Sequence, residues 1–362
     1  MMEGDDIKFD GHGRKSKMRS LTWRGDTTGS KGKAGRSTPN RDRSEAGTKA
    51  QLARIVHHTT EVVVRVAGGG KTTRQVKDHM DYITRNGKLE TIDDKGNTVL
   101  GKQAVADLHS SWNLDFGKGQ GKYKQALNVI LSMPAGTAPE RLLVAALHFA
   151  HAEFANHKFM MVLHAHDTDP HQNAPAHPHV HLVVKAEDRD RRRLEFRADT
   201  LHIWRESFAE QLRKQGIAAN ASRRYERGVS QKSKSAAEYH IGKRQGASLV
   251  LARRFAEAGA ELQRGDTKPK PWELAMAARR RDVERELAAK AAQLHQDGDL
   301  TLAATVERFA RNLPPIQTER QQMQQAILRQ QRQRLQQREQ DQPQGLAQEQ
   351  DKAQEQEPDQ ER

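Results

Sequence analysis

Histidines are concentrated in one short stretch of the chain. Six of the 17 histidines fall between residues 164 and 181. Within this stretch His179 and His181 alternate with Val180 and run into an apolar segment that ends at Val184, a pattern typical of a β-strand. Because side chains alternate along a strand, we expect both imidazoles on one face and the intervening apolar residues on the other. Two imidazoles on one face need only one ligand from a neighbouring strand to hold a divalent cation.

His164 is the candidate for that third ligand. It ends the apolar segment 160–163 and shares a face with the pair if the two segments form an antiparallel hairpin. His166 remains an alternative, because a shift of one residue in register exchanges the faces of the two histidines. We expect His171 to lie in the connecting loop, whereas His177 could support a ligand, act as a base or do neither.

Three protein imidazoles leave positions on a metal open, as catalysis requires. A histidine-rich surface loop that binds stray metal is the simpler explanation of such a cluster. The β-branched strand around His179 and His181 favours a built site instead. The chain has 61 Lys+Arg against 47 Asp+Glu, a formal charge of +14 and a pI near 9.9, so nucleic acid is the expected partner. An open divalent site in a basic protein indicates phosphodiester chemistry, with Mg²⁺ or Mn²⁺ as the ion.

The composition narrows the choice of nucleophile and of compartment. The absence of cysteine excludes disulfides, cysteine zinc sites and a thiol nucleophile. No apolar run approaches the ~20 residues of a membrane span, and the N-terminus lacks a secretory leader, so we expect a cytoplasmic protein without membrane insertion.

Among only four tyrosines, Tyr82 stands near the basic Arg85 and Lys88, late in a helix predicted over about residues 74–85. A tyrosine there is more often a core residue than a nucleophile.

The apolar periodicity predicts the elements that must position these residues. Short strands alternate with amphipathic helices between about residues 52 and 230, which indicates helices backing a sheet. The predicted strands are 54–56, 61–66, 127–132, 159–163 and 180–184, and the predicted helices are 74–85, 139–156 and 198–215.

The composition of the ends differs from that of the middle. Residues 1–50 are rich in Gly, Ser, Thr, Lys and Arg, and we expect a disordered basic arm. A folded domain is expected over 51–232 and a charged helical region over 233–315. Residues 316–362 contain 18 glutamines and form a low-complexity tail, which can hold a solvated helix but has little to bury.

Three ordered segments resemble the signature motifs of a known family. They read YITRNGKLE (82–90), LSMPAGT (131–137) and HPHVHLVV (177–184). A fourth segment, 216–228, resembles the end of the same domain. These segments are similar to those of conjugative relaxases of the P-type mobilisation class, which includes the T-DNA border endonucleases. The resemblance covers about residues 55–230 and does not extend to the tails.

The resemblance implies an α+β fold of the His-hydrophobic-His nucleases, an antiparallel sheet flanked by helices, with a helical C-terminal region and disordered tails. It also implies roles for individual residues. Tyr82 would attack the scissile phosphate and stay attached to the 5′ end. The other implied roles are metal ligation by His164, His179 and His181, orientation of a histidine by Asp167 or Asp169, and DNA contact by Ser132, with Arg85 and Lys88 adding positive charge near the phosphate.

The implied function is nicking of one strand at a plasmid transfer origin, which starts conjugative DNA transfer and can be reversed by religation. Expected partners are single-stranded DNA at the origin, accessory DNA-binding proteins of the relaxosome, and a coupling protein with its type IV secretion system, which could export the protein with the DNA. The chain departs from the family pattern in a longer loop, 170–176, between His164 and His179.

Three alternatives stay open. A replication initiator of the same nuclease superfamily would use both the metal and the tyrosine. A metal-dependent phosphodiesterase acting through water would keep the histidines and be indifferent to Tyr82. A DNA-binding protein without enzymatic activity would need neither.

Overall fold

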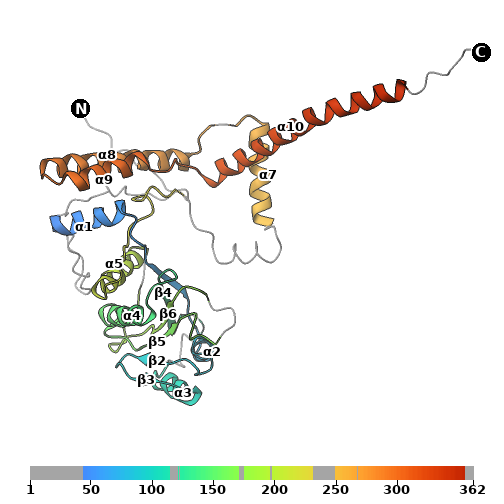
Figure 1. Cartoon of the computed structure of the whole chain (residues 1–362). Coiled ribbons are helices and arrows are strands. Elements are labelled where there is room, and N and C mark those ends of the chain that lie inside the picture. The colour runs from blue at the N-terminus through green and yellow to red at the C-terminus, as the bar shows by residue number, and fades with distance from the viewer. Residues whose placement is uncertain are drawn as a thin grey trace, which may run out of the picture. The chain divides into compact units, whose positions relative to one another are not determined.

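The computed structural model describes residues 44–114, 121, 123–170, 175–195, 198–230, 249–266 and 268–354, with side chains in the last helix described to residue 338. The chain divides into two compact units, one ending at Arg223 and the other beginning at Arg224 (Figure 1). Most of the predicted basic arm, residues 1–43, lies outside the described residues.

The first unit is built on an antiparallel sheet. Within the described residues the sheet has six strands in the order β1-β4-β6-β5-β2-β3, and every neighbouring pair is antiparallel. This confirms the predicted α+β class with an antiparallel sheet. The strands are β1 (Val63–Gly68), β2 (Thr91–Asp93), β3 (Thr98–Val99), β4 (Ala126–Ser132), β5 (Phe159–His164) and β6 (His179–Lys185).

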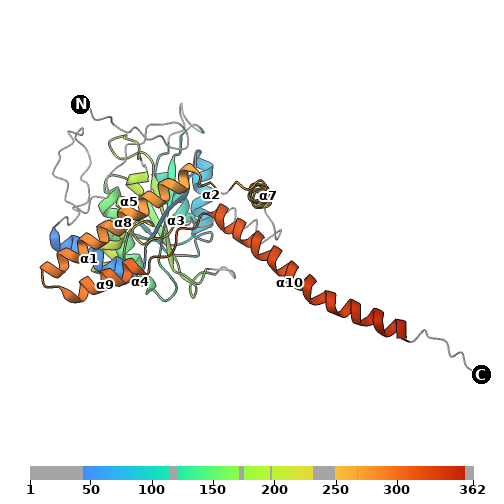
Figure 2. The same cartoon turned by 90° about the horizontal axis from the view of Figure 1, so that it is seen from above.

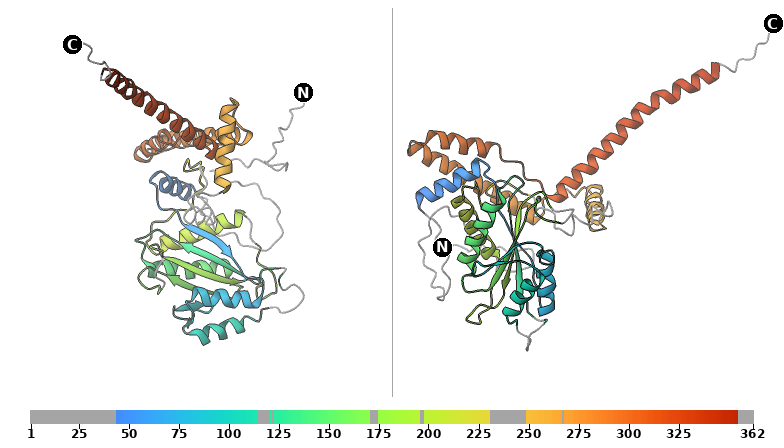
Figure 3. Two further views of the ribbon diagram at one scale, coloured as in Figure 1. Left: turned by 90° about the vertical axis from the view of Figure 1, so that its right-hand side faces the viewer. Right: turned by 60° about the horizontal axis from the view of Figure 1, so that its bottom comes forward.

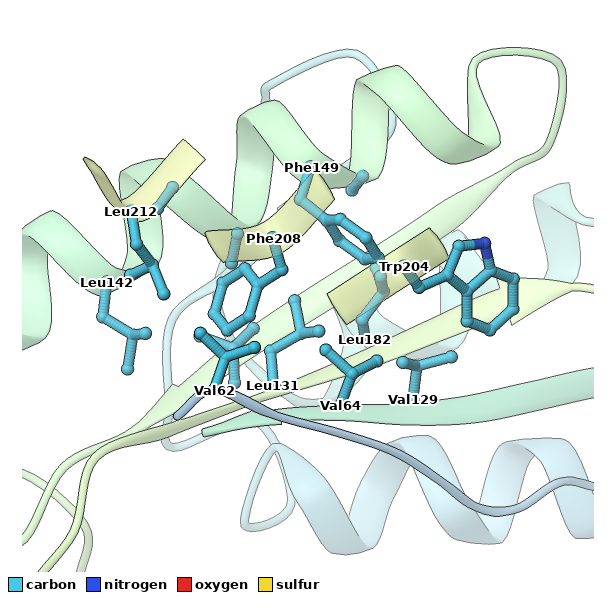
Figure 4. Close-up of a cluster of buried hydrophobic side chains, with 14 of the residues drawn as sticks. Val62, Val64, Val129, Leu131, Leu142, Phe149, Leu182, Trp204, Phe208 and Leu212 are labelled. Atoms are coloured by element: carbon cyan, nitrogen blue, oxygen red, sulfur yellow. The ribbon is translucent and has the colours of Figure 1, made fainter. Parts of the chain in front are cut away.

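Helices cover both faces of this sheet (Figure 3). Helices α4 (Pro139–Phe154) and α5 (Ala198–Lys214) pack on one face, where Phe149 and Phe208 lie over side chains of β4 and β6 such as Leu131 (Figure 4). The face with the histidines carries a second core, formed with helices α2 (Thr73–Ile83) and α3 (Lys102–Ser111). The histidine face is therefore itself partly covered by helices, which the alternation within one strand does not reveal.

Helix α2 begins and ends at chemically identifiable positions. The hydroxyl of Thr72 accepts a hydrogen bond from the amide of Gln75 at the first turn. The helix ends at Ile83, two residues before the predicted end, and the chain then passes through Arg85 and Asn86 with φ of 54° and 58°. Left-handed backbone of this kind stops a helix. The turn places Tyr82 in the last helical turn, next to a sharp change of chain direction.

Two parts of the first unit differ from the prediction. Residues 54–56, predicted as a strand, form the last turn of helix α1 (Glu45–Val56), in which Leu52, Ile55 and Val56 share a buried face at helical spacing. This helix begins inside the predicted disordered arm. Strands β2 and β3 were not predicted, because two or three residues are too few to show an alternating pattern. Helix α3 was not predicted either.

The second unit is helical. Its described helices are α7 (Leu249–Gln263), α8 (Pro271–Gln296), α9 (Leu300–Arg311) and α10 (Glu319–Gln354). Helices α8 and α9 lie side by side as a hairpin, and both Figures 1 and 2 show it. Helix α10 packs against α7 and occupies much of the predicted low-complexity tail. Among the described helices, none combines the length and the apolar character that a membrane crossing needs.

Candidate active site

The histidines meet at one end of the β5–β6 hairpin. The register pairs His164 with His179, and pairs His179 on its other side with Ser132 of β4. Paired residues of neighbouring strands point to the same face, so the hairpin predicted from the sequence brings His164 beside the pair. His166 lies beyond the end of β5 and is exposed. The ring centroids are 5.1 Å apart for His164–His179, 4.7 Å for His164–His181 and 5.2 Å for His179–His181.

The environment keeps these imidazoles neutral at pH 7. Burial, with neighbouring positive groups, lowers the pKa of His181 to about 3. Burial likewise lowers the pKa of His164 to about 4 and lowers the pKa of His179. Neutral imidazole is the form that binds metals, because the ligating nitrogen must offer a lone pair.

The donor set fits a divalent cation. In the described part of the chain, His164, His179 and His181 each offer one nitrogen, and these atoms lie within 4.8 Å of one another. Nδ1 of His179 lies 3.3 Å from the carbonyl oxygen of His177, and Nδ1 of His181 lies 3.4 Å from Oδ1 of Asn128. Since both oxygens accept, each Nδ1 carries the proton and each Nε2 keeps its lone pair for a metal.

His164 has closer contacts at both ring nitrogens. Its Nε2 lies 2.7 Å from the carbonyl oxygen of Ile83 and donates to it. Its Nδ1 lies 3.1 Å from Oδ2 of Asp169 and 3.2 Å from Nη2 of Arg85. The ring is therefore held between the end of α2 and the loop that follows β5, and one of these contacts must be given up for His164 to ligate a metal.

The two aspartates that the sequence offered for orienting a histidine, Asp167 and Asp169, have different environments in the structure. Asp169 is fully buried and accepts hydrogen bonds from Nε of Arg85 at 2.9 Å and from Nη2 at 2.7 Å. Asp167, two residues earlier, is exposed. Only Asp169 therefore stands where it can orient His164. Arg85, predicted to add charge at the DNA phosphate, is bonded to this carboxylate.

Tyr82 lies at the end of α2 with 66% of its surface exposed. The guanidinium carbon of Arg85 lies 5.4 Å from the centre of the Tyr82 ring, and Nη1 of Arg85 donates to the Tyr82 carbonyl oxygen at 3.2 Å. Since a tyrosine held for core packing would be buried, this exposure does not fit the simpler explanation considered for Tyr82.

Of the remaining predicted residues, Ser132 lies at the same end of the sheet, opposite His179. Ser132 is buried, and its Oγ lies 3.5 Å from the carbonyl oxygen of Pro178. Lys88 is exposed in the turn after α2. His171 and its neighbours to residue 174 lie outside the described residues. His177 is exposed and contributes its backbone oxygen to His179.

Two residues near the histidines were not predicted. Asn128 is 5% exposed on β4 and meets His181. His79 of α2 stands edge-on to His181, with ring centroids 6.5 Å apart, and its buried Nε2 is without a hydrogen-bond partner. An asparagine inside the apolar strand 126–131 was a usable signal, whereas nothing in the sequence marks His79.

Comparison with known families defines the class of this domain. Residues 82–217 match the family model described as relaxase, MobA/VirD2-like, nuclease domain. The matched segment runs from Tyr82 to Ile217, three residues after the end of α5, and contains the three histidines and Asp169. Residues 82–217 of the first unit are therefore similar to the relaxase nuclease domains of the MobA/VirD2-like family.

Individual relatives agree with this assignment. The T-DNA border endonuclease VirD2 of Agrobacterium fabrum is 27% identical over 226 residues, covering 56% of this chain and 47% of its own length. VirD2 of Rhizobium rhizogenes is 26% identical over 226 residues, covering 56% of this chain and 48% of its own length. The chain thus spans about half the length of the curated relatives it matches.

Proposed function

We propose that this protein nicks one DNA strand at a plasmid transfer origin by transesterification to Tyr82, and so starts conjugative DNA transfer. The observation that carries the proposal is the position of an exposed tyrosine whose next residue, Ile83, is hydrogen-bonded to a histidine of a metal-binding cluster. The relaxase nuclease domain and the similarity to T-DNA border endonucleases support it.

The step is an exchange of one phosphodiester for another. The Tyr82 oxygen forms a bond to the 5′ phosphorus, and the bond from that phosphorus to the 3′ oxygen of the preceding nucleotide breaks. The phenol loses its proton and the departing 3′ oxygen gains one. One phosphodiester bond forms as another breaks, so no external energy source is needed. Because the ester energy is kept in the 5′-phosphotyrosine, the 3′-OH can reverse the reaction and religate the strand.

The candidate site residues have different roles in this step. His164, His179 and His181 would hold a divalent cation, Mg²⁺ or Mn²⁺, which would neutralise charge on the phosphate oxygens when bound. Asp169 would position His164 through Arg85, whose Nη2 is paired with the Asp169 carboxylate and donates to Nδ1 of His164. Ser132, which pairs with His179, and the exposed Lys88 would contact the DNA strand around the scissile phosphate.

The partners follow from this function. The substrate is the single strand at the origin, presented by accessory DNA-binding proteins of the relaxosome. A coupling protein and a type IV secretion system would then take up the covalent complex, so the protein would act in the donor cytoplasm and leave it with the DNA. The high net charge, +14, is consistent with a nucleic-acid partner.

A nicking assay on supercoiled plasmid carrying the origin tests the proposal. Tyr82→Phe removes one hydroxyl and no charge, so nicking should be abolished while DNA affinity stays within a few-fold. The matched control is Tyr123→Phe, which changes another exposed tyrosine and should nick normally. Cleavage by Tyr82→Phe at the wild-type rate would overturn the tyrosine mechanism and favour attack by water, and full nicking in EDTA would overturn the metal requirement.

A further inference from the structure

The chain leaves α2 through a turn with consecutive left-handed residues. Arg85, Asn86 and Gly87 have φ of 54°, 58° and 80°. Gly87 is required there, because a Cβ would come within 2.3 Å of the amide nitrogen of Lys102. Arg85 has no such freedom, since left-handed backbone is unfavourable for a residue with a long side chain. Contacts of the Arg85 side chain therefore add to the backbone hydrogen bonds that hold this turn.

Those contacts join two distant segments of the sequence. The guanidinium of Arg85 bridges both carboxylate oxygens of Asp169, which is 84 residues away and fully buried. A planar fork that meets both oxygens fixes orientation as well as distance. The same guanidinium reaches Nδ1 of His164 and the carbonyl oxygen of Tyr82.

A second contact ties the same two segments. The Ile83 carbonyl accepts the proton of Nε2 of His164 at 2.7 Å. At the end of the helix that carries Tyr82, Ile83 thus contacts His164 and Arg85 contacts Asp169. Any tilt of this end of α2 would have to break the Ile83–His164 bond and the Arg85–Asp169 pair together.

We propose that the Arg85–Asp169 ion pair is a clamp that positions Tyr82 relative to the histidine cluster, and that Arg85 acts through this clamp and not by binding a DNA phosphate. The inference rests on the proposed tyrosine mechanism. A geometric error of about 1 Å in the placement of a reacting group can cost about 10²-fold in rate, so the clamp acts on the rate of the chemical step.

The clamp predicts a shared phenotype for two residues that are far apart in sequence. In the full-length protein, Arg85→Gln and Asp169→Asn should each lower the kcat for nicking of an origin oligonucleotide by about 10²-fold with KM unchanged. The double variant should be no slower than either single variant, because the residues act as a unit. The alternative, a phosphate contact, predicts instead that Arg85→Gln alone weakens DNA binding.

Salt dependence separates these two outcomes. A lost phosphate contact reduces the slope of log affinity against log salt by about 0.7 for single strands. The slope for an origin oligonucleotide in EDTA should stay unchanged in Arg85→Gln and fall in the control Lys88→Gln, which removes an exposed charge three residues away. Arg85→Lys keeps the charge without the fork, so it should be as slow as Arg85→Gln.

Hydrogen exchange tests the clamp without any cleavage. The amides of Asn86 and Leu89 bond to the carbonyl oxygens of Asp81 and Thr84, at 2.7 and 2.9 Å, and report directly on the turn. Both amides should exchange faster in Asp169→Asn as well as in Arg85→Gln, while amides of β5 and β6 keep their protection.

Three results would overturn the clamp: unchanged exchange in Asp169→Asn, a reduced salt slope in Arg85→Gln, or wild-type kcat in either variant. Failure of the tyrosine mechanism would show separately, as nicking by Tyr82→Phe at the wild-type rate. In that case hydrogen exchange still tests the clamp, because this measurement does not depend on cleavage.

Discussion

The carbonyl oxygen of Ile83 lies 2.7 Å from Nε2 of His164, so the residue next to Tyr82 is bonded to the histidine cluster. A carbonyl can only accept, and the pKa of His164, lowered by burial to about 4, keeps the ring neutral at pH 7. The proton must therefore reside on Nε2. Nδ1, the nitrogen that faces Asp169, is left with the lone pair.

Loss of one of the paired histidines should remove metal binding and nicking together. His179→Ala or His181→Ala deletes a candidate ligand, so the affinity for Mn²⁺ should fall by more than the ~10–100-fold that is typical of losing an outer partner. Mn²⁺ should bind more tightly than Mg²⁺, because imidazole prefers the transition metal. Titration calorimetry of the DNA-free protein measures the affinities for Mn²⁺ and for Mg²⁺. In the nicking assay, excess Mn²⁺ or Mg²⁺ should restore the activity of the variants only in part.

His166→Ala is the control for this prediction, since His166 is exposed and outside the cluster. It should bind metal and nick as the wild type does. Equal loss in His166→Ala and His179→Ala would show that the loop, and not the cluster on the sheet, holds the ion.

Asn128 should tune the metal affinity through His181. Its Oδ1 lies 3.4 Å from Nδ1 of His181, inside the sheet, and Asn128→Ala removes the acceptor that holds the ring. The affinity for Mn²⁺ should fall by about 10-fold, the lower end of the range for such partners. Calorimetry on Asn128→Ala checks this, and thermal unfolding of the same variant shows whether the sheet is intact. An unchanged affinity would contradict the role assigned to Asn128.

The first unit should cleave DNA without the second. A fragment of residues 44–230 contains the whole described sheet, both of its cores and all the candidate site residues. It must start before residue 51, because α1 begins at Glu45 and buries Leu52 and Ile55. Its nicking rate and origin choice should match those of the full chain, while its DNA affinity should be lower and less dependent on salt, because basic segments are lost.

Circular dichroism establishes whether this fragment folds. A folded fragment that binds DNA but does not cleave, or that no longer prefers the origin, would show that the removed residues belong to the active module.

The second unit should lose stability in acid through Glu261. A hydrogen bond from Arg320 of α10 lowers the pKa of this carboxyl of α7 below its ordinary value of 4.5. A lowered pKa in the folded state stabilises the fold above pH 4.5, and that contribution is lost as the pH falls through the lowered value. Glu261→Gln should therefore be less stable than wild type by about 1–2 kcal/mol at pH 7, with the difference vanishing in acid.

Denaturant unfolding followed by helicity, at pH 7 and at acid pH, measures this difference. Glu257→Gln is the matched control on the same helix, because its exposed pair with Arg253 should contribute little. A difference between wild type and Glu261→Gln that persists unchanged in acid would contradict the ionic origin of the contact.

Local sequence patterns were sufficient for the four longer strands, β1, β4, β5 and β6, and for the histidine pair. Alternation places His179 and His181 on one face, and hydrophobic periodicity locates most of the elements between β4 and α5. It failed for residues 54–56, where β-branched residues favour a strand. Burial of Leu52, Ile55 and Val56 along one helical face outweighs that preference.

The choice between equivalent candidates depended on the tertiary structure. The sequence offered Asp167 and Asp169 on equal terms, and only the fold buries Asp169 between Arg85 and His164. The same is true of Asn128, whose partner His181 is 53 residues away. Periodicity describes which way neighbouring side chains point, whereas these contacts arise where strands and helices distant in the chain are packed together, and no local pattern carries that information.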